Sequence, residues 1–411
     1  MLAIGIVAAL VLSLLPYAIA MKSDVEQAFR PSSTANATLS SPSTANKTPG
    51  EPAFDIAAWY VSRGEEPETH GVLIETLDQS RVLASHNADI VFNPASLIKL
   101  STSLAALEQL GADYRFQTRV LMDGRIDRDG TLQGRLYVVG NDPTFGDVGA
   151  GMISSELRAR GIKKIKDGLF VSTDFVFNFS DSAEDSAARL VKALHLGEPA
   201  TGVADAAPSG TPLFVFNSYP LRDILLYMNA RSSNFIAERI GALIGGPEAV
   251  QRFLIEQLHL PAEQVSIERV SGREHNRMTP RGLLAVIRAL IVEANRQGLQ
   301  LSDIMPVASD DAGTLRRRLA GTGLEGAVVA KTGTLTHEVD GGMASLAGIV
   351  YTKDSGIIVF AIMDQGNRIW DNRQLEDQLL AEVVVTQATP QVVASPTPRQ
   401  LLPSSELQIV K

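Results

Sequence analysis

Ser96 and Lys99 stand three residues apart in the run Ser96-Leu97-Ile98-Lys99. On a helix, residues at this spacing lie above one another, so the lysine amine can reach the serine hydroxyl. A serine hydroxyl becomes a good nucleophile when a neighbouring base takes its proton, and a buried lysine has the lowered pKa that such a base needs. The pair indicates an enzyme that forms an acyl-serine. The alternative is a serine that caps a helix beside a lysine that reaches solvent.

The residues around this pair predict a helix that ends at Gly111. Pro94 is tolerated in a first helical turn, where its missing N–H has no partner to lose. Apolar residues then follow at helical spacing, and they are Leu97, Ile98, Leu100, Leu104, Leu107 and Leu110. Ser96 is therefore expected near the N-terminus of the helix. Because this helix is apolar nearly all round, Lys99 is expected in or beside a core.

A second polar group, Ser232-Ser233-Asn234, falls between two predicted helices at 220–230 and 235–243. A junction between packed helices holds hydroxyl and amide groups more rigidly over a cleft than a solvated loop does. Taken by itself, the triplet also fits an ordinary capping turn.

A third group, Lys331-Thr332-Gly333, follows the apolar run 327–330. Glycine lets another backbone or a ligand come close to the strand. Lys331 and Thr332 add a positive charge and a hydroxyl, which together suit the terminal carboxylate of an extended peptide. The alternative is a strand that ends in a turn with an exposed lysine.

The pattern of strands predicts how distant segments meet. A β-hairpin is expected from 71–77 and 81–85, and three more strands are expected at 326–335, 343–351 and 356–363. Helical segments lie between the two sets. We therefore expect one antiparallel sheet built from both ends of the chain, with the middle partly an insertion.

Composition excludes several classes of function. The chain has 411 residues, of which 45% are hydrophobic, and a net charge of −9, with no basic run interleaved with aromatics, so nucleic-acid binding is not expected. It has no cysteine, which removes disulfides and thiolate chemistry. Its six histidines are scattered without a zinc-binding motif. No metal and no cofactor are expected.

Both termini differ in composition from the rest of the chain. Residues 2–20 are almost all apolar and end in Ala18-Ile19-Ala20, so 1–20 reads either as a signal peptide or as a membrane anchor. Both readings export the protein to the cell envelope. Residues 21–53 are expected to be a disordered linker, and the proline-rich segment 386–411 a disordered tail.

The three groups and their flanking sequences resemble the D-alanyl-D-alanine carboxypeptidase/endopeptidase family of class C penicillin-binding proteins. The matching runs are 93–102, 110–118, 139–144, 311–315 and 330–335. The resemblance implies an α+β, serine β-lactamase/D,D-peptidase-like fold, in which an antiparallel sheet has helices on both faces. It also implies a peptidase domain of residues 54–118 and 213–385. The interval from Ser96 to Ser232 is short for this family, so one smaller inserted domain is expected at 119–212.

The resemblance implies three catalytic roles. Ser96 would be the acylated nucleophile and Lys99 its general base, while Ser232 would relay a proton to the leaving amine. The substrates would be peptidoglycan stem peptides, and β-lactams would bind at the same serine. Carboxypeptidase and endopeptidase preferences both stay open, as does the oligomeric state.

The resemblance also implies a set of substrate-binding residues, namely Asn234, Lys331, Thr332, Gly333 and Thr334. Asn234 would hold the peptide amide, and Lys331 with Thr332 would bind the terminal carboxylate. The backbone N–H of Thr334 and that of the nucleophile would form the oxyanion hole.

Two positions depart from the family pattern, and two other functions are possible for a chain with these motifs. Ser233 and Arg269 stand where aspartate is usual. A class A β-lactamase would need a Glu-x-x-x-Asn run after the second group, which neither Glu268 nor Glu274 begins. An inactive peptidoglycan-binding module of the same fold is disfavoured because the reactive positions are intact.

Overall fold

The computed structural model describes residues 54–204 and 209–410. The predicted leader at 1–20 and linker at 21–53 lie outside the described residues. Within the described ranges, no helix has the length and apolar character needed to cross a membrane.

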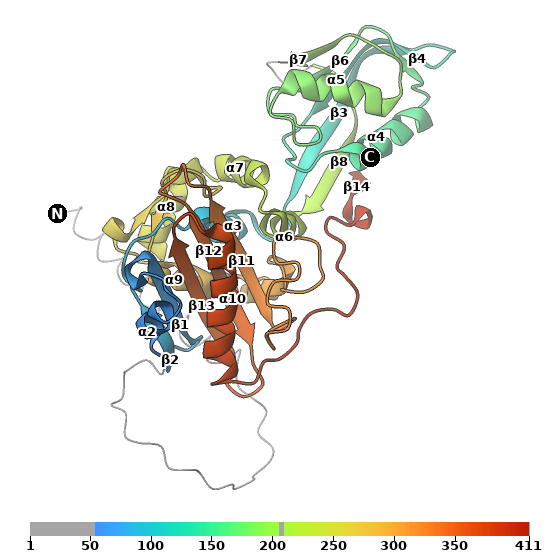
Figure 1. Cartoon of the computed structure of the whole chain (residues 1–411). Helices are drawn as coiled ribbons and strands as arrows, with labels where there is room; N and C mark the ends of the chain where they lie inside the picture. The colour runs from blue at the N-terminus through green and yellow to red at the C-terminus, as the bar shows by residue number, and fades with distance from the viewer. Residues whose placement is uncertain (1–53, 205–208, 411) are drawn as a thin grey trace, which may run out of the picture.

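A five-stranded sheet forms the centre of the larger lobe, in the order β11-β12-β13-β1-β2 (Figure 1). Its neighbouring strands are all antiparallel. The strands are β1 (His70–Thr76), β2 (Val82–His86), β11 (Val328–Leu335), β12 (Met343–Tyr351) and β13 (Ile357–Gln365). The N-terminal hairpin joins the C-terminal strands where β1 pairs with β13, from His70 opposite Asp364 to Thr76 opposite Ile358. The predicted sheet built from both ends of the chain is confirmed.

Each face of this sheet packs against helices. Alternate side chains of β13 belong to the cores on opposite faces. Ile358, Phe360 and Ile362 belong to a core shared with α2 (Ile56–Val61) and α10 (Ile369–Val385). The intervening residues of β13 belong to the opposite core, which they share with α3 (Ile98–Leu110) and α9 (Pro280–Arg296). A strand buried on both faces is apolar without a break, because successive side chains point to opposite sides. The α+β fold with helices on both faces is thus confirmed; α10 crosses the near face in Figure 1.

Three further helices and a short ribbon complete the larger lobe. They are α6 (Leu221–Arg231), α7 (Asn234–Leu243), α8 (Gly246–Gln257), β9 (Val265–Ser266) and β10 (Arg277–Met278). The helices predicted at 220–230 and 235–243 are confirmed to within a residue or two, and so is the helix that ends before Gly111.

A smaller lobe is built around a second sheet, whose main path runs β14-β8-β3-β4-β6-β7 (Figure 1). Its strands are β3 (Arg115–Ile126), β4 (Thr131–Val139), β5 (Lys164–Ile165), β6 (Gly168–Ser172), β7 (Thr201–Ala204), β8 (Thr211–Pro220) and β14 (Gln408–Val410). Helices α4 (Asp147–Ala159) and α5 (Ala183–Leu194) belong to the same lobe. The segment proposed as an insertion, 119–212, lies within the part of the chain that forms this lobe. The strands by which the chain enters and leaves this lobe, β3 and β8, lie side by side, because Arg115 at the start of β3 pairs with Pro220 at the end of β8.

The C-terminal segment corrects one expectation. Residues 386–411 were expected to form a disordered tail, but the structure gives segments of 386–410 defined partners. Val393 and Ala394 donate backbone hydrogen bonds to Gly326, and β14 pairs with β8 in the other lobe. Leu407 is buried in the smaller lobe's part of the core. The prolines interrupt helical and strand periodicity, but the backbone between them still finds partners at exposed sheet edges, which periodicity does not reveal.

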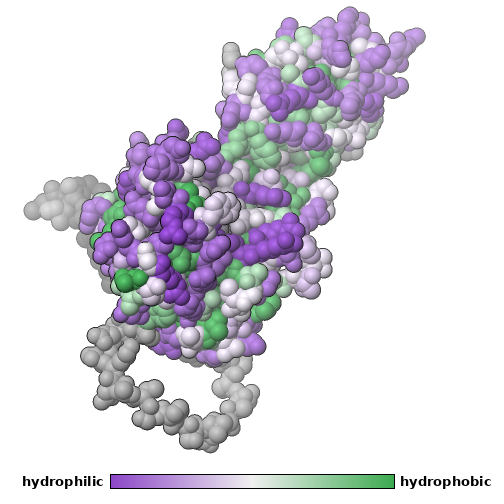
Figure 2. All heavy atoms as spheres, viewed as in Figure 1, coloured by the Kyte–Doolittle hydropathy of each residue, from purple (hydrophilic) through white to green (hydrophobic). Residues whose placement is uncertain are grey.

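Hydrophilic side chains cover most of the surface seen in Figure 2, in both lobes. The large apolar residues that are exposed come from separate elements, for example Val61, Phe179 and Trp370. Single exposed apolar residues are normal on a folded protein.

The ordered tail yields a prediction on stability. Leu407→Ala should lower the free energy of unfolding by about 2 kcal/mol, because it leaves a cavity between the tail and the smaller lobe. Thermal unfolding and limited proteolysis of the tail would measure the change. The control is Val410→Ala, since that side chain is half exposed. Equal stability and equal protease resistance of the Leu407 variant would show that the tail does not pack as described.

Candidate active site

Ser96 lies in a short 3-10 turn, η2 (Ala95–Leu97), that leads into α3. The turn begins from an unusual backbone conformation, since Ala95 has a positive φ of 51°. Asn93 holds this conformation by accepting a hydrogen bond from the N–H of Ala95 at 3.0 Å. Asn93 in turn donates to the carboxylate of Asp340 at 2.6 Å. The serine is partly exposed while its neighbours Ala95 and Leu97 are buried, so the fold presents Ser96 from a rigid base.

Lys99 is fully buried one turn below the serine, as the sequence predicted. Its Nζ lies 3.0 Å from Ser96 Oγ and 2.7 Å from Asn234 Oδ1, and it also donates to the carbonyl oxygen of Ser271. A neutral amine has two N–H groups and one lone pair. The amide oxygen and the carbonyl oxygen can only accept, so they take both N–H groups. The lone pair is left to face the Ser96 hydroxyl.

The surroundings of Lys99 also favour the neutral amine. Burial lowers the pKa of Lys99 to about 7, the negative charge of Glu238 opposes this shift, and the positive charge of Arg273 adds to it. At neutral pH a large fraction of the amine is therefore unprotonated and able to accept a proton.

The segment 269–272 shapes the site through its backbone. Ser271 supplies the carbonyl that binds Lys99, and its N–H donates to Glu238 at 3.2 Å. Gly272 has a φ of 85°, and a Cβ on it would lie 2.0 Å from the carbonyl oxygen of Ala95. The side chain of Arg269, which stands where aspartate is usual, is exposed. From the sequence, this segment was recognised only as a departure from the family pattern. Its contact with the turn that carries Ser96 was not predicted.

The second group forms a sharp junction between α6 and α7. Ser232 ends α6 in the left-handed conformation, and Ser233 caps α7 by accepting from the N–H of Ile236. Serine and aspartate serve equally well at a helix N-cap, which accounts for Ser233 where aspartate is usual. This junction sends Asn234 toward Lys99, while Ser232 Oγ accepts a hydrogen bond from Lys331 Nζ at 2.9 Å.

Lys331 is fully buried on β11. Besides Ser232, it donates to the carbonyl oxygen of Thr332 at 2.5 Å. Burial lowers the pKa of Lys331 well below its usual value, and the nearby charges of Lys99 and Arg373 lower it further. Among the described residues no hydrogen bond joins Ser232 directly to the serine nucleophile candidate, so the structure places Ser232 with Lys331 rather than with Lys99.

Thr332 is tied to a loop that the sequence identified only by its likeness to the family. Its hydroxyl donates to Thr314 Oγ1 at 2.8 Å. The N–H of Thr314 donates to the carbonyl of Ala230, and a Cβ on Gly313 would lie 2.6 Å from that same oxygen. The run 311–315 therefore links the end of α6 to β11.

Gly333 lets β11 pack closely against the turn of Ser96. A Cβ there would lie 2.1 Å from Ser345 Oγ and 2.9 Å from the carbonyl oxygen of Pro94. The close approach expected at this glycine is present: the nearest atom is the side-chain oxygen of Ser345, and the nearest backbone atom is the carbonyl oxygen of Pro94. The next residue, Thr334, donates to the carbonyl of Gly333 at 2.7 Å and accepts from Arg373 at 2.6 Å. The two backbone N–H groups expected to form an oxyanion hole thus belong to elements in direct contact.

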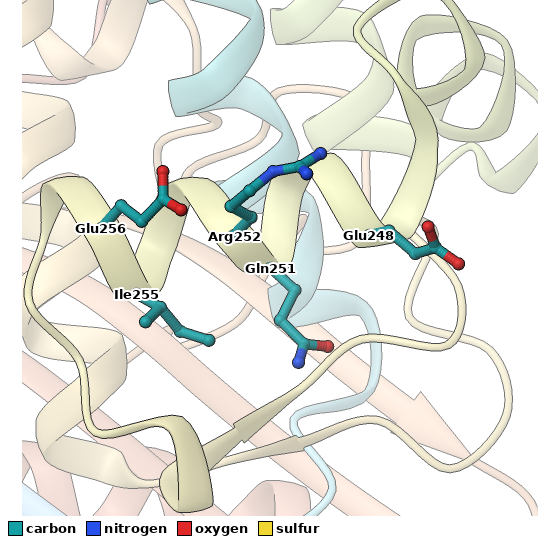
Figure 3. Close-up of a pocket in the computed structure, with 5 residues that line it drawn as sticks. All are labelled: Glu248, Gln251, Arg252, Ile255 and Glu256. Atoms are coloured by element: carbon teal, nitrogen blue, oxygen red, sulfur yellow. The ribbon is translucent and has the colours of Figure 1, made fainter.

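A separate shallow pocket lies on the surface of α8 (Figure 3). Its lining residues all come from this one helix and are Glu248, Gln251, Arg252, Ile255 and Glu256. Figure 3 shows no convergence of reactive groups there, and none of these residues belongs to the group around Ser96.

Comparison with known proteins gives consistent matches. The model of the D-Ala-D-Ala carboxypeptidase 3 (S13) family matches residues 56–189 and 172–387. A D-alanyl-D-alanine carboxypeptidase of Actinomadura sp. (strain R39) is 33% identical over 117 residues, which are 28% of this chain and 22% of that protein. The D-alanyl-D-alanine carboxypeptidase DacB of Haemophilus influenzae is 33% identical over 115 residues, 27% of this chain and 23% of that protein. The matched stretches thus span about a quarter of these relatives.

Solved structures share the fold. A predatory endopeptidase from Bdellovibrio bacteriovorus, in complex with an immunity protein, superposes with a TM-score of 0.70 at 21% identity, covering 83% of this chain and 99% of that one. A further structure of that endopeptidase is acylated by penicillin G.

The contact between Gly272 and the turn of Ser96 can be tested directly. Gly272→Ala should lower the rate at which a labelled penicillin acylates Ser96 by more than tenfold, because the new Cβ displaces the backbone of Ala95. Intact-protein mass spectrometry would follow the reaction.

Gly161→Ala is the matched control for this change. Gly161 has a nearly equal φ of 86°, but nothing lies within 4 Å of its Cβ position. Both variants therefore strain the backbone alike, and only one touches the site. Equal acylation rates in the two variants would contradict the proposed role of Gly272.

Proposed function

Because the chain belongs to the D-Ala-D-Ala carboxypeptidase 3 (S13) family, we propose that it is a serine-type D,D-peptidase acting on peptidoglycan stem peptides. It would cleave the peptide bond that follows a D-alanine carbonyl. The observation that carries this proposal is the buried Lys99 amine, whose Nζ lies 3.0 Å from Ser96 Oγ. That arrangement supplies a base to a serine without a histidine.

The first half of the reaction forms an acyl-serine. Lys99 takes the hydroxyl proton as Ser96 Oγ attacks the D-alanine carbonyl carbon. The backbone N–H groups of Ser96 and Thr334 stabilise the oxyanion of the tetrahedral intermediate, where one donor is typically worth about 3 kcal/mol. The C–N bond then breaks, and the leaving amine takes the proton that Lys99 had accepted, which leaves the Lys99 amine neutral again. Ser232, hydrogen-bonded to Lys331, is suited to pass that proton.

The second half returns the enzyme to its starting state. A water molecule attacks the acyl carbon and Lys99 takes the water's proton; the bond to Ser96 Oγ then breaks, and Lys99 returns that proton to Ser96 Oγ. Asn234 is suited to hold the substrate's amide because its side chain is already fixed through Lys99. Lys331, Thr332 and the close contact at Gly333 would place the carboxylate end of the peptide along β11.

β-Lactams would react with the same serine, since their strained amide presents a carbonyl in the same place. Acylation of the Bdellovibrio endopeptidase by penicillin G supports this proposal through the shared fold. The substrate lies outside the cytoplasm, and we propose that the protein acts there. A terminal D-Ala-D-Ala and a peptide cross-link would be cleaved by the same chemistry.

Labelling tests the nucleophile. Protein incubated with a labelled penicillin should carry the label on Ser96, and Ser96→Ala should carry none, because the acylated atom is gone. Peptide mapping by mass spectrometry would locate the label. Ser155→Ala, at an exposed position in the smaller lobe, should label as the unchanged protein does.

The outcomes separate the alternatives. Unlabelled wild-type protein would refute the proposed function and indicate an inactive module. A label that is lost within seconds would indicate a β-lactamase. A stable label together with release of D-alanine or of cross-linked peptide is the result expected of a D,D-peptidase.

The pKa of Lys99 yields a prediction on pH. The reactive form is the neutral amine, so the acylation rate should rise as the pH increases through about 7 and level off above it. Glu238→Gln removes the charge that opposes the shift, so the midpoint should move to lower pH. Glu248→Gln on α8 is the control and should leave the midpoint in place. A midpoint that stays or rises in the Glu238 variant would contradict this assignment of the base.

A further inference from the structure

One face of α7 serves the site. Asn234 and Glu238 are four residues apart, so their side chains lie on the same face of the helix. Asn234 accepts a hydrogen bond from Lys99 at 2.7 Å, and Glu238 accepts one from the N–H of Ser271 at 3.2 Å. The carbonyl oxygen of Ser271 is the other acceptor of the Lys99 amine. A shift of α7 would therefore disturb both groups that bind this amine.

The adjacent face of α7 meets a loop of the smaller lobe. Phe235 and Arg239 have the same four-residue spacing, one position further along the helix. The ring of Phe179, from the smaller lobe, lies edge-on to Phe235 with 5.8 Å between ring centres, and it stacks on Tyr227 of α6 at 6.2 Å. In the same loop, the carboxylate of Asp181 lies 3.9 Å from Arg239. One ring thus bridges α6 and α7, which lie at the side of the larger lobe nearest the smaller lobe (Figure 1).

The backbone that presents Phe179 is held in an unfavourable conformation. Asn178 and Phe179 have positive φ angles of 50° and 60° in succession. Asparagine tolerates this left-handed conformation, but it is uncommon for an aromatic residue. The N–H of Asn178 donates to the carbonyl of Phe145 at 3.0 Å, and its side chain donates to Asp147 at 3.1 Å, so the loop is fixed within its own lobe. The ring itself is 44% exposed, so its burial in that lobe does not account for the strain.

We propose that Phe179 is a positioning residue for the active site, an inference that rests on the proposed D,D-peptidase function and extends it to the smaller lobe. By packing against α6 and α7 at once, the ring holds Asn234 and Glu238 beside Lys99. The strained loop is the means by which a rigid lobe places that ring on the two helices. The smaller lobe thereby contributes to acylation through the position of a helix rather than through a reacting group.

The test is the pH dependence of acylation by a labelled penicillin in Phe179→Ala. Loss of the ring frees α7, water reaches the Lys99 amine, and the burial that lowers its pKa is weakened. The midpoint of the rate profile should therefore move above the value near 7 of the unchanged protein, and the plateau rate should fall about tenfold. Glu238 raises the pKa of Lys99, Arg273 lowers it, and Lys99 in turn acts on Lys331. Movement of Glu238 alone would shift the midpoint downward, so an upward shift reports the entry of water.

Phe170→Ala is the matched control. Phe170 also belongs to the smaller lobe and also contacts an aromatic ring, that of Tyr137 at 5.8 Å, but both residues lie on strands of that lobe. This variant should lose stability in the smaller lobe and keep both the midpoint and the plateau rate. Phe179→Tyr keeps the ring and should restore the midpoint. Phe179→Leu keeps an apolar side chain and should shift the midpoint less than alanine does, and it also serves if the alanine variant does not fold.

The inference fails if the midpoint in Phe179→Ala stays at or below that of the unchanged protein, whatever happens to the rate. An equal upward shift in Phe170→Ala would also overturn it, since any damage to the smaller lobe would then have the same effect. If the unchanged protein is not acylated at all, the proposed function itself is wrong and this inference falls with it. That result appears in the unchanged protein and the others only in the variants, so the two failures are distinguishable.

Discussion

The site depends on keeping one lysine amine away from water while every atom it touches stays fixed. Lys99 is buried among a hydroxyl, an amide oxygen and a carbonyl oxygen that come from three separate segments. Each partner is held by something else: Ser96 by the turn that follows Asn93, Asn234 by its place at the start of α7, and Ser271 by Glu238. If any of these segments moved, the amine would regain solvent and its ordinary pKa.

This constraint explains the closeness of packing around the nucleophile. Gly272 and Gly333 both pack directly against the turn that carries Ser96. Neither contact leaves room for a Cβ. Catalytic groups need such placement to within a fraction of an ångström. Close backbone packing achieves it at the cost of tolerance to substitution, so these glycines act as positioning residues.

Much of this arrangement could be predicted from the sequence. The helix behind Ser96, the junction at Ser232 and the strand before Lys331 follow from apolar periodicity and from helix start and stop signals. The joining of β1 to β13 followed from the strand-like runs at both ends. Residues that act through the backbone or across long separations could not be predicted in this way. The Ser271 carbonyl, Thr314 and Arg373 carry no local signal, because their contacts exist only once distant elements are packed.

The C-terminal strand has a consequence for how the molecule is made. β14 (Gln408–Val410) is the last strand described, yet it forms an edge of a sheet whose other strands all lie between Arg115 and Pro220. The central sheet has the same property, since β1 must wait for β13. Contacts between residues far apart in the sequence have the largest entropic cost of loop closure, so they form late in folding. Until β13 and β14 have been synthesised, β1 and β8 each lack a neighbouring strand, and in that interval the growing protein depends on its surroundings to avoid pairing with other strands.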